Sequence, residues 1–183
     1  MRHFSISNIS AAALITAAIA LGCDRPADPT APSTSAGSDR GAAQVVKQVP
    51  FKATFNATGT AAALPEDRCP VLTVGIQGTG NATHLGRYTT EQSHCAAPPS
   101  LAFTDGEFTF TAANGDQIRG TYFGEFVPLD PPLFTVDGHF TITGGTGRFA
   151  GATGGGDASG VQNLATGDVT VSLVGTISSV GPL

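Results

Sequence analysis

Alternating apolar and polar residues fill most of the chain after residue 50. In residues 133–143 the even positions are mostly Phe, Val and Ile, while the odd positions are mostly Thr, Asp and His. Residues 168–178 alternate in the same way. Shorter rows of this kind occupy residues 51–56, 72–76, 107–111 and 118–126. A period of two, with one side buried and one side wet, predicts strands of an antiparallel sheet.

Turn residues separate these runs. The pairs Asp105-Gly106 and Asn114-Gly115 favour the positive backbone angles of tight hairpins, and we predict a hairpin at each. Looser turns are predicted at residues 153–157 and 163–167, and three prolines between 128 and 132 should separate two long strands. The whole pattern predicts eight or nine strands joined by short connections, with no crossover helices.

Such a set of strands can form a sandwich or close into a barrel. Glycines within the predicted strands provide the bends that a tightly curved barrel needs, and we therefore favour a single antiparallel eight-stranded β-barrel. These glycines are Gly75, Gly78, Gly86, Gly120, Gly124, Gly138 and Gly175. A lipocalin is disfavoured, because the chain has no tryptophan for the usual Gly-x-Trp signature.

The N-terminus has the pattern of an export signal. Arg2 precedes an apolar run over residues 9–21, which is shorter than a membrane span of about 20 residues. The run ends in Ile-Ala-Leu-Gly-Cys at residues 19–23, which resembles the lipobox of bacterial lipoproteins. We expect residues 1–22 to be removed and Cys23 to carry lipid, which would anchor the protein to the bacterial cell envelope. The alternative is an ordinary signal peptide cleaved elsewhere.

Residues 23–48 are rich in Pro, Ala, Ser, Thr and Gly, and large apolar residues are almost absent before Val45. Such a segment cannot bury enough apolar area to offset its ordering entropy, so we predict a disordered tether. Residues 49–183 then form the one folded domain.

A glycine-rich turn in that domain resembles a known family. The stretch Gly144-Gly145-Thr146-Gly147-Arg148-Phe149-Ala150-Gly151 is similar to a turn of the allene oxide cyclase barrel-like superfamily, which includes plant dirigent proteins. The resemblance implies an eight-stranded barrel with an apolar lumen. We interpret the turn as structural: Gly144, Gly145, Gly147 and Gly151 permit unusual backbone angles, which leaves Phe149 free to close one end of the barrel.

Two cysteines remain in the folded domain. Cys69 and Cys95 enclose 25 residues, and paired cysteines in an exported domain usually form a disulfide. The alternative is a metal site formed by both thiols with His84 and His94, but the spacing matches no common zinc pattern. We therefore predict a disulfide, and neither a metal nor a cofactor.

Polar residues that could face the lumen are few. If the strand around residue 88 turns that face inward, His84, Tyr88 and Tyr122 could contact a ligand; the alternative is ordinary packing of amphipathic rings. Acidic residues outnumber basic ones by 14 to 9, which disfavours nucleic acid as a partner.

No nucleophile elbow, metalloprotease helix or phosphate loop is present. We favour a non-enzymatic envelope protein that binds a small apolar ligand or an envelope partner. The alternative is an isomerase- or cyclase-like enzyme, or a dirigent-like one, using Tyr88, Tyr122, His84 and Glu125 in the lumen. A purely structural role is the third hypothesis. Whether the lumen is open or filled decides among them.

Overall fold

The computed structural model describes residues 47–62 and 68–178. The predicted leader, Cys23 and all but the end of the predicted tether lie outside the described residues. The described elements are β1 (Gln48–Ala62), β2 (Leu72–Ala82), β3 (Gly86–Ala96), β4 (Ala102–Ala112), β5 (Gln117–Asp130), β6 (Leu133–Gly145), the short 3₁₀ helix η1 (Gly147–Phe149), β7 (Gly154–Asn163) and β8 (Asp168–Ser178). No helix in this part of the chain is long and apolar enough to cross a bilayer.

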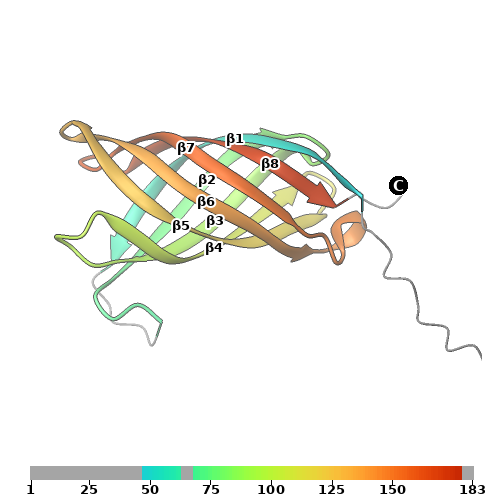
Figure 1. Cartoon of the computed structure of the whole chain (residues 1–183), viewed down its shortest axis with the longest axis horizontal. Coiled ribbons are helices and arrows are strands. Elements are labelled where there is room, and N and C mark those ends of the chain that lie inside the picture. Colours follow the sequence, from blue (N-terminus) through green and yellow to red (C-terminus); the bar gives the residue numbers. More distant parts are fainter. Residues whose placement is uncertain (1–46, 63–67, 179–183) are drawn as a thin grey trace, which may run out of the picture. The chain divides into compact units, whose positions relative to one another are not determined.

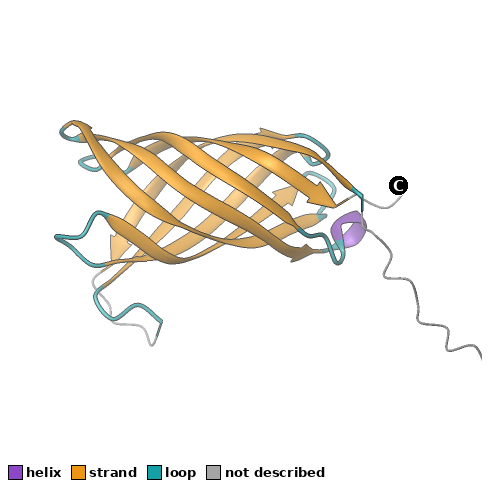
Figure 2. Ribbon diagram, viewed as in Figure 1, coloured by secondary structure: helices purple, strands orange, loops and turns teal. Residues whose placement is uncertain are grey.

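The eight strands form one closed antiparallel barrel, as predicted (Figures 1 and 2). Each strand pairs with the next one in sequence, and β8 pairs with β1 to close the cylinder. The closing register places Gln48 opposite Ser178 and Thr58 opposite Asp168. The sheet is therefore complete within residues 48–178.

The alternation seen in the sequence separates the inside of this barrel from the outside. In β1 the odd positions from Phe51 to Ala57 are buried and the even positions are exposed. The core consists mainly of Phe, Val, Ile, Leu and Ala side chains that point inward from all eight strands. On the outside lie mostly Thr, Ser, Asn and charged side chains, among them His139, whose side chain is 60% exposed and pairs with Asp157.

Glycines make room for the aromatic rings inside. Four rings each lie directly across from a glycine on the neighbouring strand, so the ring covers the backbone where a side chain is missing. A β-carbon placed at Gly120 would lie 2.5 Å from the Phe108 ring, and one at Gly106 would lie 2.7 Å from the Tyr122 ring. The cross-strand pairs are Gly80 with Tyr88, Gly106 with Tyr122, Gly120 with Phe108, and Gly124 with Phe103.

Two predicted turns are wrong. Asp105-Gly106 is not a hairpin: it lies inside β4, where the register with β5 shifts between Phe103 and Gly106. Asp105 does have a positive φ of 51°, so the dipeptide makes a β-bulge rather than a chain reversal. The bulge lets both Phe103 and Phe108 point inward although they are five residues apart. Residues 154–157, predicted as a turn, instead begin β7.

The other predicted turns are confirmed, and the barrel has two different ends. Asn114-Gly115 connects β4 to β5 at the same end as η1, the β2–β3 turn and the start of β1. Phe149 of η1 is fully buried in the core there, and Arg148 pairs with Asp116 of the β4–β5 turn at 3.5 Å. We call this the closed end; the connections β1–β2, β3–β4, β5–β6 and β7–β8 form the opposite, open end (Figure 1).

Candidate functional site

One strand supplies a polar strip to an otherwise apolar interior. Tyr88, Thr90, Gln92 and His94 alternate along β3 and point into the barrel, whereas the outward positions between them are mostly exposed. Within the strip, the Gln92 side-chain amide donates a hydrogen bond to the Thr90 hydroxyl at 3.0 Å. The strip runs from Tyr88, near the closed end, to His94, near the open end.

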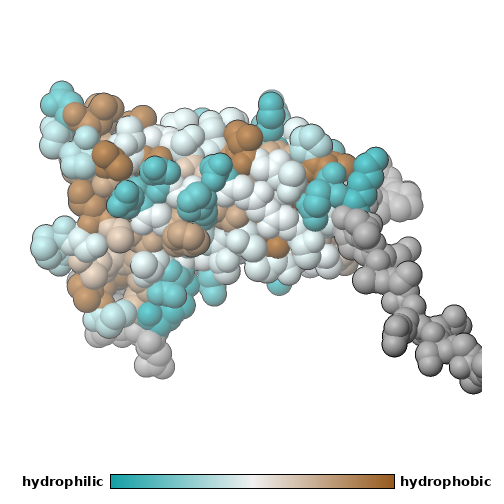
Figure 3. All heavy atoms as spheres, viewed as in Figure 1, coloured by the Kyte–Doolittle hydropathy of each residue, from teal (hydrophilic) through white to brown (hydrophobic). Residues whose placement is uncertain are grey.

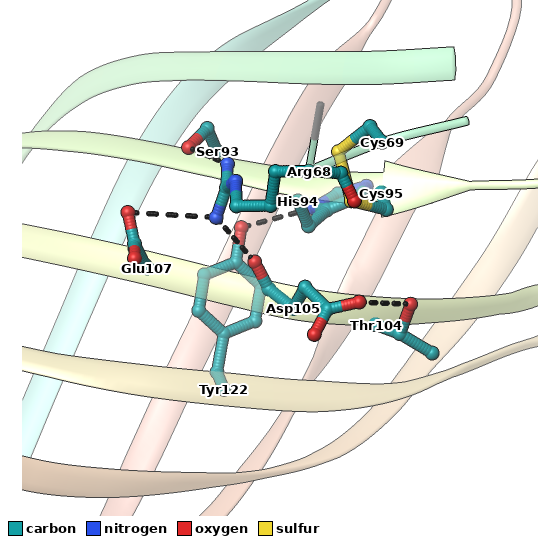
Figure 4. Close-up of a disulfide and its surroundings, with 9 residues drawn as sticks. All are labelled: Arg68, Cys69, Ser93, His94, Cys95, Thr104, Asp105, Glu107 and Tyr122. Carbon is teal, nitrogen blue, oxygen red and sulfur yellow. Dashed lines mark hydrogen bonds and ion pairs between the residues drawn. A yellow bond between two sulfur atoms is a disulfide. The ribbon is translucent and has the colours of Figure 1, made fainter. Parts of the chain in front are cut away.

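His94 and Tyr122 form a hydrogen-bonded pair inside the barrel. The Nδ1 atom of His94 lies 2.9 Å from the Tyr122 hydroxyl, and the two rings meet edge to face (Figure 4). Phe103 packs on both of them and on Phe126, with ring centres 5.1–6.0 Å apart. His94 is only 3% exposed. Among the described residues, its Nε2 atom has no hydrogen-bond partner.

Burial keeps this pair uncharged. Desolvation, with a smaller contribution from the nearby Arg68 charge, lowers the pKa of His94 to about 4. Burial also raises the pKa of Tyr122 above its usual value. At neutral pH the pair is therefore a neutral imidazole and a neutral phenol, which can both donate and accept a hydrogen bond.

Arg68 is held on the outside of the barrel, next to His94. Its guanidinium donates hydrogen bonds to the Ser93 hydroxyl at 2.7 Å and to the Asp105 carbonyl of the bulge at 2.6 Å. It also pairs with Glu107 at 3.4 Å. The adjacent Cys69 forms a disulfide with Cys95, the residue after His94 (Figure 4). The bulge, the arginine and the disulfide together fix the end of β3 that carries His94.

The disulfide was predicted and is confirmed. The alternative metal site loses both of its thiols to this bond. Within the described residues, no group of three or more His, Cys, Asp or Glu side chains could hold a metal ion. His84, in the turn before β3, is also separated from His94 by most of the length of that strand.

The space inside the barrel is unevenly distributed. A small cavity of about 50 Å³ lies among the core rings and reaches Phe123 and His139 of the outer face; it is large enough only for a few water molecules. A larger cavity of about 540 Å³ lies at the open end and is lined mainly by apolar residues from the strand ends and connections. His94, Phe126 and Gln162 line both cavities and form the floor of the larger one, which we call the mouth cavity.

The three residues predicted to face a ligand lie in different places. Tyr122 lines the small cavity and is hydrogen-bonded to His94. Tyr88 is buried nearer the closed end, stacked on Phe110 at 4.5 Å, and its hydroxyl donates to the Thr54 carbonyl at 3.2 Å. His84 lies outside the lumen in the exposed β2–β3 turn, where Nε2 is 3.1 Å from the Pro50 carbonyl oxygen. Glu125 is on the exposed face of β5.

Sequence reasoning missed His94 and Gln162 as lumen residues. A signal for His94 was present, because it shares the even-numbered face of β3 with Tyr88. Most residues on that face are polar, so the apolar alternation that marks the other strands is absent. The inward face of this strand could therefore not be recognised from the sequence. Gln162 shares the inward face of β7 with Ala158 and Gly160, and these small residues give only a weak pattern. The pairing of β7 with β6 and β8 is needed to show that this face points inward.

Comparison of the chain with models of known protein families and with curated proteins gave no match in either case.

Proposed function

We propose that this protein binds a small, uncharged, mainly apolar ligand in the mouth cavity. The observation that carries the proposal is the continuity of this cavity with the neutral His94–Tyr122 pair. Its volume of about 540 Å³ falls in the range of about 300–1,000 Å³ that small-molecule sites occupy. Grooves on the outer wall have similar volumes of about 570–620 Å³, but they are not lined by His94. The ligand body would lie against Phe126 and the connections, with one polar group hydrogen-bonded to Nε2 of His94 or to Gln162.

Charge argues for an uncharged ligand. Among the described residues, neither cavity is lined by Lys, Arg, Asp or Glu. An ionised ligand would lose its hydration at the cavity floor without gaining a counterion there. Arg68, the nearest cation to His94, is engaged by Ser93, Asp105 and Glu107 on the outer surface.

Titration with Nile red, an uncharged apolar dye, tests this proposal. Wild-type protein should bind one dye molecule per barrel, with a blue-shifted and saturable emission. His94→Ala should weaken binding about fivefold or more, because it removes a hydrogen bond at the cavity floor. Tyr88→Phe is the matched control: it removes another buried polar group of β3 that does not line the mouth cavity, and should leave the affinity unchanged. Non-saturable binding, or equal effects of the two variants, would contradict the proposal.

We also propose that the barrel is exported and lipid-anchored through Cys23, on the sequence pattern of residues 1–23. Growth of the bacterial host with an alkyne-tagged fatty acid should label the wild-type protein. Cys23→Ser should abolish the label and release the barrel from the membrane fraction. A labelled Cys23→Ser protein would refute the assignment of the lipid to this residue. Native mass spectrometry of the membrane-extracted protein would then show which lipid or metabolite it carries.

The His94–Tyr122 hydrogen bond favours a second candidate, an isomerase- or cyclase-like activity of the superfamily that the turn resembles. A neutral imidazole beside a phenol can take a proton from a bound molecule and return it at another position. If so, the ligand recovered from the protein should gain deuterium at carbon when incubated with wild-type protein in D₂O. Tyr122→Phe should slow this exchange, and unchanged deuterium content with the wild type would exclude proton transfer.

A further inference from the structure

The two ends of the barrel differ in what their connections expose. At the open end, each of the four connections carries or directly adjoins an exposed aliphatic side chain: Val71, Leu101, Leu129 with Leu133, and Leu164. We call these five residues the apolar rim; they are 37–60% exposed. At the closed end, no large apolar side chain of the described residues is exposed, because Leu85 and Phe149 turn into the core.

The apolar rim surrounds the entrance to the mouth cavity. Two residues of the apolar rim, Leu101 and Leu164, also line the mouth cavity. Pro98 and Pro99 line the cavity beside them. In the space-filling view, apolar residues gather at the end of the barrel that carries these connections (Figure 3). The β5–β6 hairpin, built on two of the longest strands, carries Leu129 and Leu133 beside its turn. Exposed apolar groups on every connection of one end indicate a contact surface rather than scattered surface leucines.

We propose that the apolar rim docks on the surface of a lipid bilayer, so that the mouth cavity opens toward the acyl chains. This inference rests on the proposed function, because an uncharged apolar ligand resides in membranes and would enter the cavity from them. The described connections at this end, with the strand residues next to them, carry only Arg68, Asp130 and Asp168 as charges, and Arg68 is already paired. The rim therefore suits a zwitterionic surface and has no excess of cations to attract an anionic one.

The length of the chain before β1 permits this orientation. The barrel begins at Gln48, at the closed end, and 24 residues separate Gln48 from the proposed anchor at Cys23. Fully extended, 24 residues span about 80 Å. The 15 residues of β1 span about 50 Å. A lipid-anchored barrel can therefore turn its open end to the membrane that holds it.

The test compares two hairpin tips of the full chain, extracted from membranes and mixed with phosphatidylcholine vesicles containing brominated acyl chains. An environment-sensitive dye is attached at Asp130→Cys, between the rim leucines, or at Asn114→Cys, on the corresponding hairpin of the closed end. Cys69 and Cys95 are oxidised, and the thiol of Cys23 is blocked by the proposed lipid, so only the introduced cysteine reacts. We expect the dye at 130 to be quenched about fivefold more than the dye at 114, because only the rim reaches the acyl-chain boundary.

A variant pair separates docking from ligand binding. Leu129→Ser/Leu133→Ser should remove the quenching at 130 yet leave Nile red binding in solution unchanged, because neither leucine lines the mouth cavity. Phe123→Ser/Val174→Ser removes two exposed apolar side chains of the barrel wall and should leave the quenching intact. Equal quenching at both tips, or loss of quenching in the wall variant, would overturn the docking. Energy transfer between dyes at 130 on two copies, without bromine quenching, would assign the rim to a second copy of this chain instead.

Discussion

At the scale of single residues, His94 decides the chemistry of the barrel interior. It is the one histidine of the described chain that is buried, and it contacts both cavities. Its hydrogen bond to Tyr122 satisfies one ring nitrogen, and the Phe103 ring packs against the imidazole. The lumen therefore offers a ligand a hydrogen-bonding group that carries no charge.

The lowered pKa of His94 predicts a loss of stability in mild acid. Its folded-state pKa of about 4 lies below the usual 6.5, so folding favours the neutral form. The neutral His94 side chain contributes its full share of the folding stability above pH 6.5, and this share is lost as the pH falls toward 4. The total loss is on the order of 2–3 kcal/mol. Urea unfolding at pH 7 and pH 4.5 measures it. His94→Gln should flatten this part of the pH dependence, and a parallel decline in both proteins would assign it to other groups.

A second prediction concerns the glycine opposite Phe108. Gly120→Ala would place a β-carbon against the Thr141 carbonyl oxygen and the Phe108 ring and should lower the free energy of unfolding by about 1–3 kcal/mol or more. Gly75→Ala is the matched control, because its nearest contact would be the Thr60 carbonyl oxygen at 3.9 Å. That variant should be neutral or slightly stabilising. Equal costs in thermal unfolding would show that strand glycines act through flexibility and not through the space they leave.

At the scale of elements, β3 is the strand that departs from the general pattern. Its inward side is polar, whereas the inward sides of β1, β6 and β8 are almost wholly apolar. Its final residues depend on contacts made outside the barrel, namely the Cys69–Cys95 bond and the hydrogen bonds of Arg68. These contacts hold His94 at the floor of the mouth cavity.

Removal of the disulfide should therefore affect both stability and the site. The bond closes a loop with a sequence separation of 26, and its loss should cost about 3–4 kcal/mol. Cys69→Ser/Cys95→Ser should also weaken Nile red binding, because the end of β3 is less fixed. Chemical unfolding and dye titration of the same preparation measure the two effects. An unchanged affinity in a destabilised protein would show that Arg68 and the bulge suffice to position His94.

The element scale also shows what the sequence could predict. Apolar alternation in residues 133–143 and 168–178 predicted β6 and β8 closely, because a strand with one buried face has an apolar residue at every second position. The dipeptide Asp105-Gly106 correctly indicated a positive φ, but the hairpin turn predicted from it is wrong. A β-bulge and a hairpin turn share this local backbone geometry, so the dipeptide alone does not distinguish them. The His94–Tyr122 pair joins residues of two strands that are not neighbours, and their distance depends on barrel curvature and register. No local pattern carries that information.

At the scale of the whole molecule, the barrel combines a filled end with an open one. The closed end contains η1 and Phe149, and the open end contains the mouth cavity and the apolar rim. The first and last strands meet along the barrel wall, with Gln48 opposite Ser178. The chain therefore begins and ends its sheet at the same place.

This arrangement predicts that the barrel tolerates circular permutation. A short linker from residue 178 to residue 48, with new termini between Asn114 and Gly115, should preserve a strand-rich circular dichroism spectrum and cooperative unfolding. The control opens the chain between Thr121 and Tyr122, inside β5, where new termini interrupt paired backbone. That permutant should fail to fold. A native-like control permutant would show that barrel closure does not require an intact β5.

Closure of the sheet also limits how other proteins can recognise this one. Within the described chain, every strand has a hydrogen-bonded neighbour on both sides, and only strand ends such as residues 127–130 of β5 are paired on one side, so no strand presents a free edge along its length. Binding by addition of a ninth strand, a common mode among sheet proteins, is therefore not available. A protein partner would have to contact side chains on the barrel wall or on the connections at the two ends. Substitutions at these side chains should therefore change which partner binds.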